Sequence, residues 1–224
     1  MKPMTEKHLA ILRRHMVEIV EMHFDLSSEE IGSDTLDPAI RRAMLEVPRH
    51  LFVPSSIAAL AYQDGPLPIG FDKTISQPFI AAVMMQLARI EPGSRVLEVG
   101  TGLGYQASVM AKMGAEVFSV EVVEEFAEAA EARFKALGLD VEVKVGDGSR
   151  GWPEHSPYDR IIVTAAAAEA PVELVDELAA GGRMVIPLGG EDVQALSVIE
   201  KSADGSLDVR QLMPVRFTRL ETIS

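Results

Sequence analysis

The sequence predicts a doubly wound α/β domain, in which helices cover a mostly parallel sheet. The first observation that predicts this fold class is a series of apolar runs of strand length, at residues 95–99, 116–120, 141–145, 158–164 and 183–187. Stretches of helical period separate most of these runs, and alternating strands and helices are typical of a parallel sheet. Two further runs, at 195–200 and 206–212, flank Asp204-Gly205, which is a strong hairpin signal. We therefore expect an antiparallel strand pair near the C-terminus.

The composition excludes several classes of protein. The chain has 224 residues, 47% of them hydrophobic, which is enough for one sizeable α/β domain with a small accessory part. The formal net charge of −13 argues against a broad nucleic-acid-binding face, which needs a basic surface. The chain has no cysteine, which excludes disulfides, thiolate nucleophiles and cysteine metal sites. We expect no nucleic-acid partner and no bound metal.

No segment of the sequence is typical of a membrane protein. The longest uncharged and mostly apolar run, residues 79–88, is too short to cross a bilayer and contains Gln86. The N-terminal segment carries mixed charges and lacks the apolar core of a secretory signal. We expect a cytoplasmic, monomeric protein that does not contact membranes.

The first seventy residues predict two helices and a long connection. Apolar residues at helical spacing between Leu9 and Val20 indicate the first helix, and polar residues 27–35 indicate a loop. His8, His15 and His23 lack metal-ligand spacing and are interpreted as surface residues. Asp37-Pro38 predicts the start of the second helix, which should end before Pro48. The proline- and glycine-rich connection that follows, residues 47–70, is too apolar for a flexible linker, and long ordered connections are usually functional.

Two interpretations of Ser76 remain open from the residues alone. In Thr74-Ile-Ser-Gln-Pro78, Ser76 is placed to cap a helix that runs to about Arg89. Alternatively, its hydroxyl lies beside free helix N–H groups and holds a carboxylate of a substrate. The two uses are compatible if the backbone donors are shared.

The glycine-rich segment Glu98-Val-Gly-Thr-Gly-Leu-Gly104 follows the first strand and precedes a helix at 105–112. In an open parallel sheet, ligands bind at the carboxyl end of this strand. The spacing G-x-G-x-G differs from the G-x-G-x-x-G of dinucleotide sites, and no Lys or Arg follows before Lys112. The Glu98 carboxylate repels phosphate and attracts an ammonium or sulfonium group. The segment therefore favours S-adenosylmethionine over NAD, although a tight strand-to-helix turn needs glycine with or without a ligand.

Two more carboxylates lie at strand ends. Glu121 closes the second strand, about where doubly wound folds place the acidic residue that binds ribose hydroxyls, although an exposed helix start also favours glutamate. Asp147, in Gly146-Asp-Gly148, ends the third strand and is suited to accept from an adenine amino group. An Asx turn is the structural alternative for Asp147.

Three later segments complete the sequence-based predictions. The small residues 165–168 indicate that the backbone approaches a ligand or a helix closely, and residues 215–220 predict a final strand. His155 is interpreted as a structural or surface residue.

Several segments together resemble the protein-L-isoaspartate O-methyltransferase family. They are Val47-Pro-Arg-His-Leu-Phe-Val-Pro54, Thr74-Ile-Ser-Gln-Pro78, Val96-Leu-Glu-Val-Gly-Thr-Gly-Leu-Gly-Tyr-Gln106, Gly146-Asp-Gly148, Gly151-Trp-Pro-Glu-His-Ser-Pro-Tyr-Asp159, Ile161-Ile-Val-Thr-Ala-Ala166 and Pro214-Val-Arg-Phe217. The resemblance extends from about Asp37 to Leu220. It implies a Rossmann-like methyltransferase fold with an N-terminal helical extension and substrate-side connection at 1–75 and the methyltransferase domain at 76–224.

The resemblance also implies an activity and a set of site residues. The methyl donor would be S-adenosyl-L-methionine, the product S-adenosyl-L-homocysteine, and the acceptor the α-carboxylate of L-isoaspartyl residues in damaged peptides and proteins, with D-aspartyl residues as a candidate second acceptor. Ser76 falls on the family's active-site serine. The donor-binding positions are Glu98, Gly100, Thr101, Gly102, Glu121, Asp147 and Gly148. The substrate-side positions are Thr74, Ile75, Ser76 and Arg216.

The sequence departs from the family pattern before Thr74, where Phe71-Asp72-Lys73 replaces the more usual Gly-x-Gly-Gln continuation. This departure puts the shape of the substrate-entry loop in question and keeps a non-catalytic donor-binding protein as a rival. A second rival is a methyltransferase of the same fold that acts on a small molecule or RNA. A NAD dehydrogenase is the least favoured, because the sixth-position glycine is missing.

Overall fold

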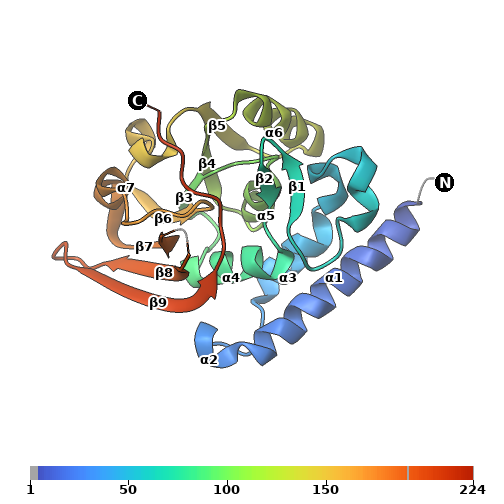
Figure 1. Ribbon diagram of the computed structural model, residues 1–224, viewed down its shortest axis with the longest axis horizontal. Coiled ribbons are helices and arrows are strands. Elements are labelled where there is room, and N and C mark those ends of the chain that lie inside the picture. Colours follow the sequence, from blue (N-terminus) through green and yellow to red (C-terminus); the bar gives the residue numbers. More distant parts are fainter. Residues whose placement is uncertain (1–4, 191, 224) are drawn as a thin grey trace.

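The computed structural model describes residues 5–190 and 192–223. Its centre is a seven-stranded sheet of order β5-β4-β3-β6-β7-β8-β9 (Figure 1). The strands are β3 (Arg95–Val99), β4 (Glu116–Glu121), β5 (Val141–Val145), β6 (Tyr158–Val163), β7 (Leu178–Gly189), β8 (Gln194–Lys201) and β9 (Leu207–Val215). Strands β3 to β7 are parallel, and β8 and β9 are antiparallel to their neighbours. The predicted fold class is confirmed.

The strand order places a topological switch point between β3 and β6. The chain continues from β3 to β4 and β5 on one side, and from β6 to β7 on the other. At such a point the two halves of the sheet diverge and leave a crevice beyond the carboxyl ends of the strands. The glycine-rich segment after β3 therefore lies where a doubly wound sheet binds its ligand.

Hydrophobic cores lie on both faces of the sheet, because successive strand residues point to opposite faces. Val96, Val117 and Val185 belong to the cluster on one face, whereas Leu97, Phe118 and Met184 belong to the second cluster, which includes Leu174 and has the partly buried Trp152 packed against it. The helices are α1 (Glu6–Leu26), α2 (Ser28–Ile31), α3 (Pro38–Glu46), α4 (Pro78–Ala88), α5 (Tyr105–Lys112), α6 (Glu124–Leu137) and α7 (Val172–Glu177). Among the described residues, no helix is long and apolar enough to cross a membrane.

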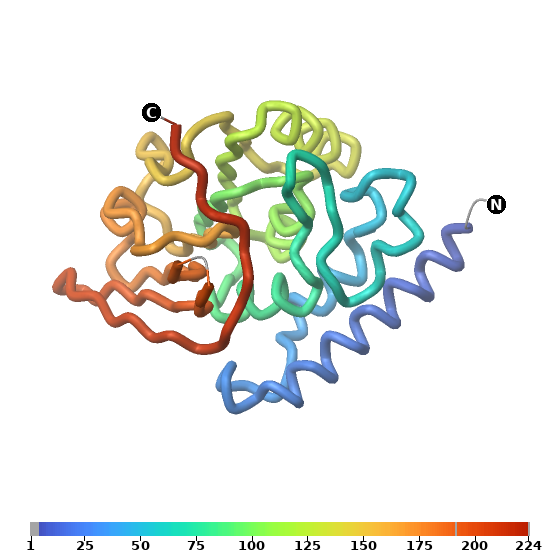
Figure 2. Tube along the Cα trace, in the orientation of Figure 1, coloured from blue at the N-terminus to red at the C-terminus, as the bar shows by residue number. Residues whose placement is uncertain are grey.

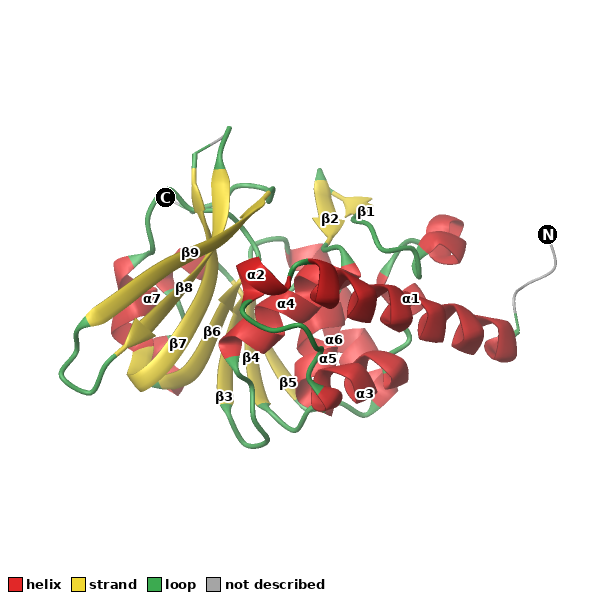
Figure 3. Ribbon diagram, turned by 90° about the horizontal axis from the view of Figure 1, so that it is seen from below, coloured by secondary structure: helices red, strands yellow, loops and turns green. Residues whose placement is uncertain are grey.

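The N-terminal helices follow the sequence closely, with one difference. Thr5 caps α1, and the Asp37 carboxylate accepts from the Ala39 N–H at 2.6 Å to cap α3. Helix α1 packs against both α3 and α4 (Figure 3). The prediction of a loop over residues 27–35 is wrong in part, because α2 forms one short turn there and ends at the left-handed Gly32. The polar residues Glu29 and Glu30 favour a helix start as well as a loop.

The connection at 47–70 is ordered, as predicted. It contains two 3₁₀ turns, Arg49–Phe52 and Ser55–Leu60, and then strand β1 (Leu67–Gly70). Strand β1 pairs with β2 (Lys73–Ile75) in a separate two-stranded hairpin. Phe71 and Asp72 form its turn, with positive φ angles of 49° and 56°. The segment that departs from the family pattern is therefore a tight hairpin turn.

The prediction of a final strand at 215–220 is wrong. Strand β9 ends at Val215, and the next residues cross the carboxyl ends of the parallel strands, where their β-pairing within the described residues is reduced to an isolated bridge between Ala166 and Arg219. The Ala166 N–H donates to the Thr218 carbonyl, and the Leu220 N–H donates to the Ala166 carbonyl, both at 2.8 Å. Figure 2 shows this C-terminal segment as a red tube that passes across the molecule. The small residues 165–168 thus approach this segment closely, and Ala165 also lines the pocket beside the glycine turn.

Candidate active site

The turn after β3 requires glycine at its first position. Gly100 has a φ of +94°, and a Cβ on it would lie 2.3 Å from Thr164 Oγ1. The Thr164 hydroxyl donates to the Gly100 carbonyl at 2.8 Å and so fixes the turn against β6. At position 148 glycine is needed because the backbone lies close to β3: a Cβ on Gly148 would lie 2.4 Å from Val99 Cγ1. These contacts hold the walls of the crevice at the ends of β3, β5 and β6.

Glu121 fixes the other side of the same turn. Its side chain accepts from the Gly102 N–H at 2.7 Å and from the Val123 N–H at 2.9 Å. The residue is 5% exposed and lines a pocket beside the turn. Each carboxylate oxygen has a further lone pair, so Glu121 can still accept from two ligand hydroxyls.

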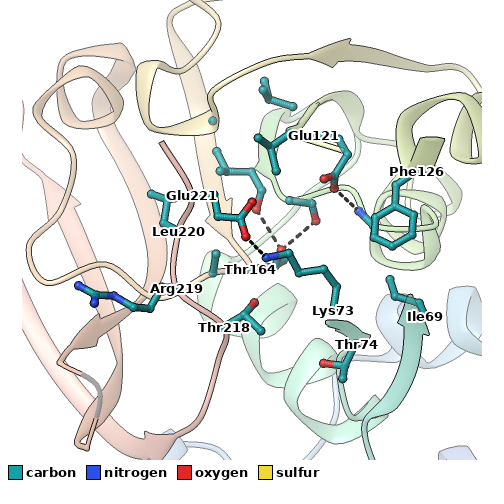
Figure 4. A pocket seen from close by; sticks show the side chains of 17 residues that line it. Ile69, Lys73, Thr74, Glu121, Phe126, Thr164, Thr218, Arg219, Leu220 and Glu221 are labelled. Carbon is teal, nitrogen blue, oxygen red and sulfur yellow. Dashed lines mark hydrogen bonds and ion pairs between the residues drawn. The ribbon is translucent and has the colours of Figure 1, made fainter. Parts of the chain in front are cut away.

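The donor pocket, as we name this hollow, lies between the glycine turn and the C-terminal segment (Figure 4). Ile69 and Phe126 form its apolar end, and Lys73 forms an ion pair with Glu221 across it. The predicted residues Thr74, Gly100, Gly102, Glu121 and Gly148 all line it. The C-terminal segment contributes the residues Thr218, Arg219, Leu220 and Glu221.

Asp147 does not line the donor pocket. Its side chain accepts from the Ser149 N–H at 2.9 Å, which is the Asx turn that the sequence left as an alternative, and from the Ile223 N–H at 2.9 Å. Burial opposes ionisation, but the bonds from Ser149 and Ile223 and the charge of Arg150 outweigh it and hold the pKa of Asp147 below its usual value. Asp147 thus anchors the C-terminal segment in this structure.

A smaller inner pocket continues from the donor pocket, with which it shares Ile69, Thr74, Gly100, Gly102 and Thr164. Glu98, Thr101, Ile75 and Ser76 also line it. Glu98 is 1% exposed, and burial raises its pKa to about 8, while the bond from Ser119 works in the opposite direction. Ser119 donates to Glu98 Oε2 at 2.6 Å and bonds Thr101 at 2.6 Å.

The inner pocket fits the amino-acid end of S-adenosylmethionine. Glu98 Oε1 and Gln106 Nε2 are buried atoms to which the described residues make no hydrogen bond of good geometry, although the Ala107 N–H is near enough to Glu98 to favour its charged form, and both residues line the pocket. Buried polar groups normally have partners, so two orphaned atoms at one hollow indicate a polar ligand. An acceptor and a donor that line one hollow match the ammonium and the carboxylate of an amino acid.

A groove of about 450 Å³ opens from the same point towards the surface. We name it the acceptor groove. It shares Ser76 and Thr164 with the inner pocket and has Arg216 and Phe217 on its far wall. The predicted substrate-side residues Thr74, Ser76 and Arg216 therefore lie along one groove, with Ile75 buried behind them.

The prediction that Ser76 caps the following helix is wrong. The N-cap of α4 is Gln77, whose side chain makes no cap bond. Asp64, fifteen positions before Phe79 in the chain, supplies the cap by accepting from the Phe79 N–H at 2.9 Å. That N–H is therefore not free, and the Ser76 hydroxyl has no hydrogen-bond partner within the described residues.

The predictions for His23 and His155 have opposite outcomes. His23 is not a free surface residue, because its Nδ1 lies 2.8 Å from the buried Asp64 carboxylate. His155 stacks on Phe118 with ring centroids 4.3 Å apart and lines none of the three hollows, in keeping with a structural role.

Sequence reasoning missed several lining residues. Gln106 and Thr164 lie inside segments that it had placed correctly, and polar residues adjoining the glycine turn were a usable signal for them. Lys73, Leu220 and Glu221 carry no comparable signal, because the β1–β2 hairpin brings Lys73 to the pocket and the path of the C-terminal segment brings the other two.

The chain is similar to known proteins over most of its length. The sequence profile "Protein-L-isoaspartate(D-aspartate) O-methyltransferase" matches residues 25–223. A protein-L-isoaspartate O-methyltransferase 2 of Syntrophobacter fumaroxidans is 49% identical over 93% of this chain and 85% of its own length.

Two solved structures share the fold. One, a protein-L-isoaspartate O-methyltransferase, is 31% identical with a TM-score of 0.79, covering 92% of this chain and 65% of its own. The other is a putative enzyme of this name from Plasmodium falciparum in complex with S-adenosyl-L-homocysteine. It is 25% identical with a TM-score of 0.79, covering 94% of this chain and 99% of its own. The chain belongs to the protein-L-isoaspartate(D-aspartate) O-methyltransferase family.

Proposed function

We propose that this protein transfers a methyl group from S-adenosyl-L-methionine to the α-carboxylate of L-isoaspartyl residues, which starts the repair of damaged peptides and proteins. One observation carries the proposal beyond family membership. The inner pocket, with Glu98 and the glycine turn, meets the acceptor groove at Ser76 and Thr164. A donor in the first hollow and an anionic acceptor in the second would meet beside the Ser76 hydroxyl.

The residues suit methyl transfer to a carboxylate. The bound donor supplies an electrophilic methyl on sulfur; the acceptor oxygen forms the new C–O bond as the C–S bond breaks, and the thioether leaves with the bonding electrons. A carboxylate is already ionised at neutral pH, so the protein needs no general base. Its task is orientation, and the Ser76 hydroxyl can donate to one carboxylate oxygen and direct the other. Arg216, exposed on the groove wall, would attract the anionic acceptor.

For the donor, we propose three contacts. Glu121 would accept from the ribose hydroxyls, Glu98 would pair with the ammonium group, and the backbone at Gly100, Thr101, Gly102 and Gly148 would allow close approach. Asp147 would accept from the adenine amino group only by sharing its oxygens with Ile223 and Ser149. We further propose that the enzyme acts as a monomer in the cytoplasm, with no nucleic-acid partner.

A paired-peptide assay tests this function. With donor carrying a tritiated methyl group, an isoaspartyl peptide should be labelled as a base-labile ester, and its aspartyl twin should not. Labelling of both peptides, or of RNA in preference to either, would contradict the proposed acceptor. Calorimetric binding of S-adenosyl-L-homocysteine without any label transfer would instead support a non-catalytic donor-binding protein.

A further inference from the structure

The first turn of α4 depends on a residue outside the helix. Asp64 Oδ1 accepts from the Phe79 N–H at 2.9 Å, and Asp64 Oδ2 accepts from Gln77 Nε2 at 2.8 Å. The Asp64 side chain is only 4% exposed. A carboxylate at this place satisfies an N–H group that has no partner in the helix and complements the positive end of the helix dipole.

The N-terminal helix α1 holds Asp64 in this position. His23 Nδ1 lies 2.8 Å from Asp64 Oδ2, and because a carboxylate oxygen only accepts, Nδ1 carries the proton. The His23 ring also packs edge-on against the Phe79 ring, with centroids 5.3 Å apart. The Phe24 ring packs against the Phe79 ring as well, with centroids 5.6 Å apart. One face of α1 therefore touches both the capping carboxylate and the helix that it caps.

Arg49 holds the main chain of Ser76 from the other side. This fully buried arginine donates from Nη2 to the Ser76 carbonyl at 2.7 Å and from Nε to the Ala61 carbonyl at 2.9 Å. Its guanidinium lies 4.7 Å from the centroid of the Tyr105 ring. The carbonyl of Ser76 and the side chain of the next residue, Gln77, are thus both anchored, whereas the Ser76 hydroxyl is left without a partner among the described residues.

We propose that Asp64 and His23 are positioning residues for methyl transfer, an inference that rests on the proposed function. Asp64 caps α4 in place of Ser76, and so the serine hydroxyl stays available to the acceptor carboxylate. His23 keeps Asp64 in place and thereby links the N-terminal extension to the reaction. The positive Arg49, which interacts electrostatically with Asp64, offsets a carboxylate that would otherwise repel the anionic acceptor.

The first test compares His23→Ala with His15→Ala, a matched control because His15 is exposed on the same helix. We expect His23→Ala to lower kcat about tenfold, because small displacements of an orienting group have large effects on rate. The dissociation constant for S-adenosyl-L-homocysteine should stay within about twofold of the original, since the donor pocket is untouched. His15→Ala should change neither quantity. His23→Gln, which keeps one N–H donor, should recover part of the lost kcat.

The measurement must separate positioning from a loss of folded protein. The kcat is therefore expressed per donor-binding site, counted by calorimetric titration with S-adenosyl-L-homocysteine. A merely structural role would lower the melting temperature and the number of sites but leave kcat per site at the original value, and this result would overturn the inference.

A second variant keeps the test decisive if His23→Ala folds poorly. Asp64→Asn retains one oxygen acceptor for the Phe79 N–H but loses the negative charge, and we expect it to lower kcat per site about thirtyfold. Unchanged kcat per site in both variants overturns the positioning role. The original protein is assayed in parallel. If it labels the isoaspartyl peptide and the variants have the same kcat per site, only the positioning inference fails. If the original protein does not label the peptide, the proposed function fails as well.

Discussion

The donor pocket and the acceptor groove are built in different ways. In the donor pocket, the predicted glycines and Glu121 come from the turn after β3 and the ends of the neighbouring strands, while the β1–β2 hairpin and the C-terminal segment form the rest of the wall. The acceptor groove joins four parts of the chain: Pro66, residues 74–80, Thr164 and residues 214–218. The glycine turn and Glu121 depend on local backbone geometry, whereas the groove as a whole depends on how separate segments pack. The comparison suggests which substitutions should change donor affinity and which should change the rate of transfer.

The largest expected effect is that of Ser76→Ala. The hydroxyl is the group that we propose donates a hydrogen bond to the acceptor carboxylate and orients it, so kcat should fall about hundredfold. Because this hydroxyl makes no bond to the rest of the described chain, stability and the affinity for S-adenosyl-L-homocysteine should stay nearly unchanged. Steady-state kinetics measures kcat, and calorimetry measures the affinity for S-adenosyl-L-homocysteine. An equal loss of kcat and of affinity would contradict the assignment of Ser76 to the acceptor groove alone.

Glu121→Ala should produce the opposite pattern. The variant loses the bonds to the Gly102 and Val123 N–H groups as well as the proposed ribose contacts. We expect donor affinity to fall about thirtyfold, because hydrogen bonds to a charged group are among the stronger ones. At saturating donor, kcat should remain within about threefold of the original. A loss confined to kcat would contradict the assignment of Glu121 to donor binding.

Glu98→Gln should have a smaller effect that depends on pH. Burial raises the pKa of Glu98 to about 8 from an ordinary 4.5, so between these values the folded protein holds a proton that the unfolded chain releases. The free energy of unfolding therefore falls as pH rises through this window, by at most about 1.4 kcal/mol per pH unit. Glu98→Gln should abolish this contribution and unfold at a higher temperature than the original protein at pH 8.

The same substitution should weaken donor binding about tenfold, because the proposed partner of the donor ammonium loses its charge. In the original protein, binding of S-adenosyl-L-homocysteine below pH 8 should release protons, since the ammonium favours the ionised carboxylate. Calorimetry in buffers of different ionisation enthalpy measures this release. Its persistence in Glu98→Gln would show that another group is responsible.

The smallest effect is expected at the contact between Lys73 and Glu221, which joins the β1–β2 hairpin to the C-terminal segment across the donor pocket. Glu221 is 52% exposed, so the ion pair is screened, and Lys73→Ala should speed dissociation of S-adenosyl-L-homocysteine by about threefold at low salt. The exchange of charges in the double variant Lys73→Glu, Glu221→Lys should restore the original rate. Stopped-flow measurements that show no recovery would exclude a role for the pairing itself.

The sequence predicted the donor side well because its signals are local. The bounds of α5 and α6, the strand before the glycine turn and the position of Glu121 all follow from glycines, caps and apolar runs within a few residues. The predicted donor-binding residues line the donor pocket or the inner pocket that continues from it, with the exception of Asp147.

Two of the errors, Ser76 as the helix cap and the final strand at 215–220, have a common physical cause. Ser76 has the residue type and the place in the sequence that are typical of an N-cap. Asp64 instead accepts the hydrogen bond from the first turn of α4, through a contact between segments that no local pattern reveals. Residues 216–220 have the composition of a strand, but they pair only briefly with Ala166 and then cross the crevice. Hydrogen-bonding choices of this kind are decided by tertiary packing, which overrides local propensity.

The path of the C-terminal segment has a practical consequence for work with this enzyme. The segment is fixed by the bond from Ile223 to Asp147 and by Glu221, both at the rim of the donor pocket. An affinity tag or a fluorescent reporter fused directly after residue 224 would pull on these anchors, whereas the same fusion placed ahead of α1 joins the chain at the opposite side of the molecule (Figure 1). Purification handles should therefore precede α1 rather than follow the C-terminal segment.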